Sequence, residues 1–145
     1  MEVETVLAPV DGSDESRTAA RYAVAVARQY DAGVHLLYVL GERVSRGVTS
    51  GDLDSSDVAE ESRAFVSGLR QHAAEHDVPA SSSVVYGFST TRKLHHPGSV
   101  VLDAAAEVDA DFLVLPREPA AGGGEALEKV AEYVLLYASQ PVLSV

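Results

Sequence analysis

Two short stretches carry residue types that could hold a small polar ligand. The first, Asp11-Gly12-Ser13, directly follows an apolar run, and the second, the glycine triplet Gly122, Gly123 and Gly124, directly precedes a helical pattern. A carboxylate accepts hydrogen bonds from sugar hydroxyls and base amines, and glycine-rich backbone at a helix N-terminus can hold phosphate oxygens. The simpler interpretations are an Asx turn that caps a helix for Asp11, and a linker for the triplet, because Glu125 and Glu128 add negative charge there.

Histidines form two pairs, His72 with His76 and His95 with His96. The first pair has the i, i+4 spacing of metal ligands on one helix face, but no third ligand is evident nearby. Ser13 has no identifiable histidine base, the chain has no Gly-x-Ser-x-Gly elbow, and it contains no cysteine to act as a nucleophile. The sequence therefore predicts neither a metal site nor an enzyme.

The elements that must position these residues alternate between strand and helix. Strands are predicted at Thr5–Val10, Val34–Leu40, Ser81–Phe88, Phe112–Leu115 and Pro141–Val145. Amphipathic helices are predicted from an N-cap at Ser13 to a left-handed cap at Gly33, from Asp57 to His76, from Pro97 to Val108 and from Leu127 to Ala138. The glycine- and serine-rich segment from Gly41 to Asp57 is expected to be a long surface loop.

This alternation predicts an α/β fold, a doubly wound five-stranded parallel sheet with four helices, in a single domain over residues 1–145. In such a sheet, ligands bind at the carboxyl ends of the strands, which places the candidate site near Asp11. Thr5–Val10 and Val34–Leu40 are apolar almost throughout, as strands covered on both faces are.

Composition restricts the partners. The formal charge is −11, from 22 acidic against 11 basic residues, and a protein so acidic is not expected to bind nucleic acid. No apolar run is long enough to span a bilayer, and the N-terminus lacks a basic start, so we expect a cytoplasmic protein without membrane contact. The many acids and only two lysines suggest a halophilic cell as a hypothesis.

Four segments in order resemble the universal stress protein family over nearly the whole length. They are PVDGSDES from Pro9, AVAVARQYDAGVHLLYVL from Ala23, HPGSVVLDAAAEVDADFLVLP from His96 and VAEYVLLYASQPVLSV from Val130. The resemblance implies a Rossmann-like fold, akin to adenine nucleotide alpha hydrolases, that commonly forms homodimers through its last strand. The interface implied here is Pro141, Val142, Leu143, Ser144 and Val145.

The family has a branch that binds ATP and a branch that does not. The resemblance places adenosine contacts at Pro9, Val10, Asp11 and Val39. Members that bind ATP hold its phosphates on a loop of the form G-x2-G-x9-G-[S/T] after the fourth strand, where glycines bring backbone N–H groups to the phosphate oxygens.

This chain departs from that loop at its defining positions. Pro116 stands in place of the first glycine, and Glu128 and Lys129 stand where Gly-[S/T] is expected. Proline offers no N–H group, and glutamate repels a triphosphate. We therefore predict a homodimeric stress-response protein that binds or regulates an unidentified protein partner, without ATP or another cofactor bound in the family's usual way. The alternative is an ATP- or AMP-binding protein whose phosphate loop is rebuilt around Gly122, Gly123 and Gly124.

Overall fold

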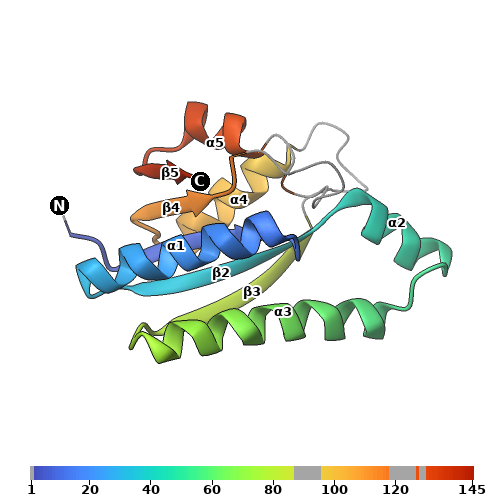
Figure 1. Ribbon diagram of the computed structural model, residues 1–145. Coiled ribbons are helices and arrows are strands. Elements are labelled where there is room, and N and C mark those ends of the chain that lie inside the picture. Colours follow the sequence, from blue (N-terminus) through green and yellow to red (C-terminus); the bar gives the residue numbers. More distant parts are fainter. Residues whose placement is uncertain (1, 87–95, 118–126, 128–129) are drawn as a thin grey trace.

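The computed structural model describes residues 2–86, 96–117, 127 and 130–145. Strands and helices follow one another as in Figure 1. Their bounds are β1 Thr5–Val10, α1 Asp14–Tyr30, β2 Gly33–Leu40, α2 Glu42–Ser50, α3 Ser55–Glu75, β3 Ala80–Tyr86, α4 Pro97–Glu107, β4 Phe112–Leu115, α5 Val130–Tyr137 and β5 Val142–Ser144. Among the described helices, none is both long enough and apolar enough to cross a bilayer.

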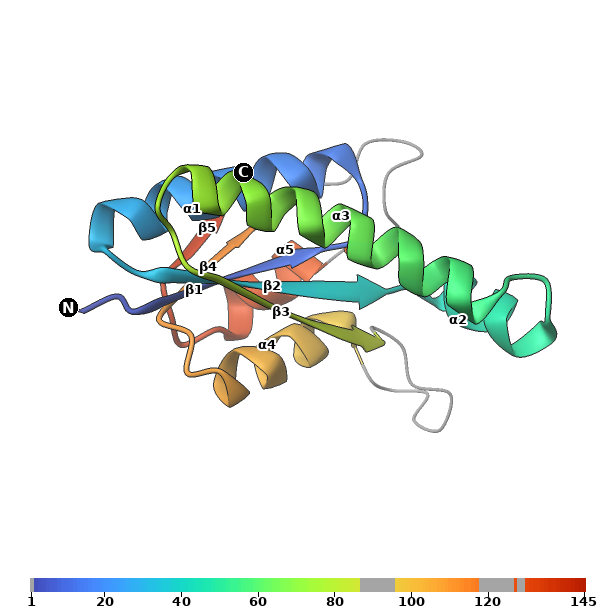
Figure 2. The same cartoon turned by 90° about the horizontal axis from the view of Figure 1, so that it is seen from below.

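All five strands lie in one parallel sheet with the order β3-β2-β1-β4-β5. Helices α1 and α3 cover one face, and α4 and α5 cover the other (Figure 2). The predicted doubly wound α/β fold is therefore confirmed. Because strand side chains alternate, β1 sends Val6, Ala8 and Val10 toward α1 and α3, and Leu7 toward α4 and α5.

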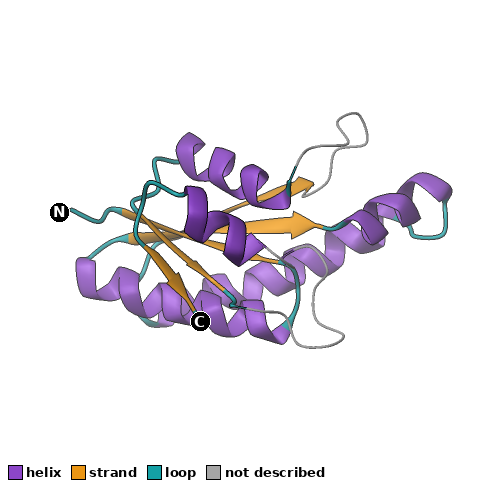
Figure 3. Cartoon of the chain, turned by 90° about the horizontal axis from the view of Figure 1, so that it is seen from above, coloured by secondary structure: helices purple, strands orange, loops and turns teal. Residues whose placement is uncertain are grey.

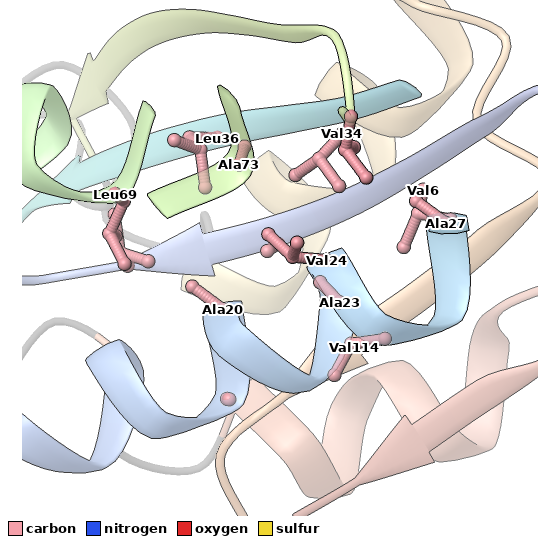
Figure 4. Close-up of a cluster of buried hydrophobic side chains, with 14 of the residues drawn as sticks. Val6, Ala20, Ala23, Val24, Ala27, Val34, Leu36, Leu69, Ala73 and Val114 are labelled. Atoms are coloured by element: carbon pink, nitrogen blue, oxygen red, sulfur yellow. The ribbon is translucent and has the colours of Figure 1, made fainter. Parts of the chain in front are cut away.

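Small residues let α1 lie close to the sheet. Ala20, Ala23 and Ala27 are fully buried there beside Val24, at the spacing predicted for the inward face (Figure 4). The helix begins at its predicted cap, since the Ser13 side chain accepts a hydrogen bond from the backbone N–H of Ser16.

The segment predicted as a long loop between Gly41 and Asp57 instead contains α2, so the described part of the chain has five helices rather than four. Gly41 and Gly51 stand at the two ends of α2, and Gly51 has the left-handed φ of 86°. Within α2, Gly47 allows Leu53 to pack against the helix: a Cβ at Gly47 would lie 2.5 Å from Leu53 Cδ1. The three glycines that suggested a loop thus mark the two ends of α2 and a packing contact, whereas Ser45 and Ser50 lie within the helix.

The prediction of a left-handed cap at Gly33 is also wrong. Asp31 adopts it, with φ 57°, and its backbone N–H donates to the carbonyl of Arg28, while Gly33 starts β2. Asp77 and Asp109 have the same left-handed φ after α3 and α4. Aspartate tolerates this region better than most residues, and here it takes the left-handed position at the cap of α1 and one residue beyond the caps of α3 and α4.

Candidate ligand site at the carboxyl end of β1

The predicted site lies where the winding of the sheet reverses. From β1 the chain passes into α1 on one face of the sheet, whereas α5, the helix that follows β4, lies on the other face; Figure 3 shows helices on both sides of the sheet. Strand β1 pairs with β4 through Val6 and Leu7, before its carboxyl end. Pro9 and Val10 are buried at the end of β1, Val39 is buried near the end of the neighbouring β2, and Asp11 follows directly. The structure brings these four residues together at the carboxyl ends of β1 and β2. Gly122, Gly123 and Gly124 lie outside the described residues.

One carboxylate oxygen of Asp11 builds the turn into α1. Asp11 Oδ1 accepts a hydrogen bond from the backbone N–H of Ser13 at 3.0 Å and from its hydroxyl at 2.5 Å. The Ser16 hydroxyl donates to the Ser13 carbonyl at 2.9 Å and accepts from the Asp11 N–H at 3.3 Å. The Asx turn expected from the sequence is confirmed, and it fixes the rotamer of the Asp11 side chain.

The other carboxylate oxygen of Asp11, Oδ2, takes no part in this turn. Asp11 Oδ2 is buried, and among the described residues it has no hydrogen-bond partner. An unsatisfied buried acceptor costs roughly 1–3 kcal/mol, more when it is charged. A hydroxyl or amine donor from a ligand would satisfy it. The Asp11 side chain therefore builds the turn into α1 through Oδ1 and keeps Oδ2 as an acceptor without a partner among the described residues.

Tyr38, which sequence reasoning missed, closes the site on the α1/α3 face. It pairs in register with Val10, and its hydroxyl oxygen lies 2.8 Å from the position that a Cβ at Gly12 would take. Burial, with the Asp11 and Glu61 carboxylates, raises the pKa of Tyr38, so its hydroxyl stays protonated at neutral pH. The only available signal was the alternation along β2, which points Tyr38 to the same face as Leu36.

Tyr38 is itself held by an aromatic and cationic contact. Its ring meets Phe65 of α3 edge to face at 5.9 Å between centroids, and the Arg17 guanidinium lies 5.0 Å from the centre of the Phe65 ring. These contacts tie the start of α1 to α3 across the end of β2. The wall of the site is thus built from both helices of this face.

The end of β4 supplies the opposite side of the crevice. Pro116 is buried there and offers no N–H donor, and Arg117 follows on the surface. The Arg117 N–H donates to the Val145 carbonyl at 2.8 Å, and the Val145 N–H donates to the Leu115 carbonyl at 2.9 Å. These bonds extend the β4–β5 pairing to the end of the chain, so neither position 116 nor position 117 offers a phosphate a free backbone N–H.

Three of the four paired histidines lie in the described residues, and each contacts a neighbouring side chain. The rings of His72 and His76 lie 4.6 Å apart at the end of α3, and burial, with the His76 and Arg21 charges, lowers the pKa of His72. His96 caps α4 through a hydrogen bond from the Gly98 N–H to Nδ1 at 2.9 Å and stacks on Tyr133 at 4.3 Å. Within the described ranges, no three histidine or acidic side chains are grouped so that they could hold a metal ion, and His95 lies outside those ranges.

Comparison with known proteins agrees with this architecture. The model of the universal stress protein family matches residues 2–145. A universal stress protein of Methanocaldococcus jannaschii is 28% identical over 144 residues, which cover 97% of this chain and 80% of that protein. UspA from Lactobacillus plantarum has a TM-score of 0.76 at 22% identity, over 100% of this chain and 99% of that one.

A further solved structure resembles the chain and carries a nucleotide. It is the universal stress protein from Archaeoglobus fulgidus in complex with dAMP, with a TM-score of 0.65 at 21% identity, over 98% of this chain and 96% of that one. At these identities the solved structures establish the fold alone. With a family model that spans residues 2–145, the conclusion is that this chain belongs to the universal stress protein family.

Proposed function

We propose that this protein acts in a stress response as a homodimeric binding or regulatory module that does not hold ATP in its family's usual way. It is not an enzyme in this proposal, and it works through contacts with a protein partner. A cytoplasmic location, in a cell rich in salt, belongs to the same proposal and rests on the acidic composition.

The observation that carries the proposal is an uncovered apolar surface at the β5 edge of the sheet. Leu135, Leu136 and Tyr137 of α5 have 56%, 70% and 65% of their surface exposed, and Leu143 of β5 has 36%. Strand β5 is the last in the order of the described strands, so no other described strand pairs with its outer edge. Apolar side chains at an open strand edge favour pairing with a second copy, in which β5 would meet β5.

Loss of the usual ATP site is supported by the end of β4. The buried Pro116 has no N–H, and that of Arg117 is already bonded to Val145. A phosphate that approached this edge would find neither donor free, and the chain carries a net charge of −11. At the two described positions after β4, the backbone therefore has no N–H group left for a phosphate.

A second candidate, binding of an adenine nucleotide through its nucleoside alone, is favoured by the unsatisfied Asp11 Oδ2. A ribose hydroxyl at the end of β1 would supply the missing donor, and the relative from Archaeoglobus fulgidus was solved with dAMP. Titration calorimetry with AMP and dAMP tests this candidate. Asp11→Asn removes the charged acceptor but keeps Oδ1 for the Asx turn, so it should abolish any binding without unfolding α1.

The dimer is tested by light scattering during size-exclusion chromatography. Leu136→Glu places a charge in the centre of the apolar patch and should convert a dimer into a folded monomer. Tyr22→Glu is the matched control, because Tyr22 is a large apolar residue of similar exposure, 51%, on α1. A wild-type monomer at high micromolar concentration, or a dimer that survives Leu136→Glu, would contradict the proposed interface.

A further inference from the structure

We propose that the groove between α3 and the open edge of β3 docks an extended acidic segment of a partner protein, which adds to the sheet as a sixth strand. This site lies at the opposite edge from β5, so it goes beyond the proposed dimer. It shares with the proposed function only the premise that the protein binds a protein partner. The inference rests on three features: an unprotected strand, a groove beside it and two arginines.

The first feature is the strand edge. Strand β3 ends the sheet order and pairs only with β2 among the described strands. The Pro79 carbonyl accepts from the Val34 N–H of β2, so alternation turns the backbone groups of Ser82 and Val84 toward the open side. No residue of β3 is charged and the strand contains no proline, so the strand itself carries neither of these two barriers to pairing with another strand.

The second feature is a hollow that runs along this edge. A groove of about 620 Å³ lies between α3 and β3 and is lined by Arg63, Arg70, Ser82 and Val84. A smaller hollow of about 270 Å³ adjoins it toward α2, shares Arg63 and Val84, and reaches Tyr86. Val84 and Tyr86 leave 53% and 56% of their surface exposed, which gives the groove an apolar floor at one end.

The third feature is positive charge in an acidic protein. Arg63 and Arg70 line the groove, and within the described residues neither makes an ion pair. They are seven positions apart on α3, which spaces them by about 10 Å along the helix. That distance matches about three residues of an extended strand, so acidic side chains two to four positions apart on one peptide can reach both arginines.

A second copy of this chain fits the groove less well than an acidic segment does. Symmetric pairing of β3 with β3 would lay both α3 helices on one face and bring both pairs of arginines into a shared groove. Like charges at such close range oppose association. Carboxylates on an extended peptide would instead pair with Arg63 and Arg70. The peptide backbone would form hydrogen bonds with the backbone N–H and C=O groups of Ser82 and Val84.

The test uses a fluorescein-labelled ten-residue peptide that alternates Glu and Val, with fluorescence anisotropy as the readout of binding. Three matched probes separate the features: the same peptide with Lys in place of Glu, the same peptide with N-methylated backbone, and Mg-ATP as a competitor. We expect only the unmodified Glu peptide to bind, without competition from Mg-ATP. The N-methylated peptide keeps its charges but cannot pair with a strand edge, and its use leaves the protein unaltered.

The protein variant is Arg63→Gln with Arg70→Gln, and Arg28→Gln on α1 is the control for loss of charge elsewhere. Loss of two exposed ion pairs predicts that the double variant binds more weakly, by up to about thirtyfold. Hydrogen exchange should show that the peptide slows the amides of Ser82 and Val84 and leaves those of Val142 to Ser144 unchanged.

The proposal is overturned if the folded protein fails to bind the Glu peptide at millimolar concentration, or if the Lys or N-methylated peptide binds as well. It is also overturned if Arg28→Gln weakens binding as much as the double variant does. Protection of Ser82 that rises with protein concentration and needs no peptide would mean that a second copy fills the groove, which also overturns it. Failure of the β5 dimer in light scattering is a separate readout and leaves this inference standing.

Discussion

Gly12 is the position where the site depends most directly on the absence of a side chain. Its φ of 88° lies in the region that L-residues avoid, and a Cβ there would stand 2.8 Å from the Tyr38 hydroxyl oxygen. Gly12→Ala should therefore incur two separate penalties. The backbone contributes about 1–2 kcal/mol, as for other L-residues forced to positive φ, and displacement of Tyr38 from its packing adds roughly 1–3 kcal/mol.

The chain contains its own control for the first penalty. Gly51 has nearly the same φ, 86°, but a Cβ there would have no atom within 4 Å. Gly51→Ala should thus lower the free energy of unfolding by the backbone penalty alone, about 1–2 kcal/mol. Urea unfolding followed by far-ultraviolet circular dichroism measures both, since the chain has no tryptophan for fluorescence.

Tyr38→Phe isolates the second penalty, because it deletes the oxygen that the new methyl group would meet, while the next ring atom lies 3.8 Å away. In a double-mutant cycle, Gly12→Ala should cost less in the Tyr38→Phe background than in the wild type, by roughly 1 kcal/mol or more. If Gly12→Ala is no more destabilising than Gly51→Ala, or if the cycle shows no coupling, then Tyr38 does not pack over the turn as described.

Two further predictions concern stability away from the site. His35 is buried between the Ser81 and Ser83 hydroxyls, each 2.8 Å from a ring nitrogen, and burial lowers its pKa below 6.5. The unfolded chain then binds the proton more readily, so stability is lost as the pH falls below 6.5, and His35→Gln should flatten that loss relative to the wild type. Asp111 Oδ2 accepts from the N–H groups of Glu4 at 2.8 Å and Thr5 at 3.0 Å. Asp111→Ala should lower the free energy of unfolding by about 1–3 kcal/mol, measured against the exposed Asp103→Ala; no loss would refute that clamp.

The spacing of apolar residues was enough to predict the sheet and four of the helices, because most of these residues are buried and recur at the period of a strand or a helix. The stripe of Ala20, Ala23 and Ala27 is one example. The spacing failed for α2, because that helix has no buried residue, Val44 and Val48 are its only large apolar side chains, and glycines stand at its ends. The N-cap at Ser13 was recognisable because capping is local chemistry, whereas the cap at Asp31 depended on how the chain turns into β2.

The candidate site, too, could be predicted only in part from the sequence. Asp11 was identifiable because it directly follows a strand. The lack of a partner for its Oδ2, and the position of Tyr38 over Gly12, depend on which strands become neighbours, and no local pattern encodes this. The α3–β3 groove could not be predicted for the same reason. Arg63 and Ser82 line one groove because α3 packs beside β3 at the edge of the sheet, which the sequence does not show.

The measurement that tests the central claim most directly is thermal unfolding with and without saturating Mg-ATP, at high salt, on a sample shown by light scattering to be dimeric. A competent site at a hundredfold excess over its dissociation constant would add about 2.7 kcal/mol of stability, which is roughly 5–10 °C in a chain of this size. We predict no shift. A clear rise would contradict the claim and show that the chain holds the triphosphate despite Pro116.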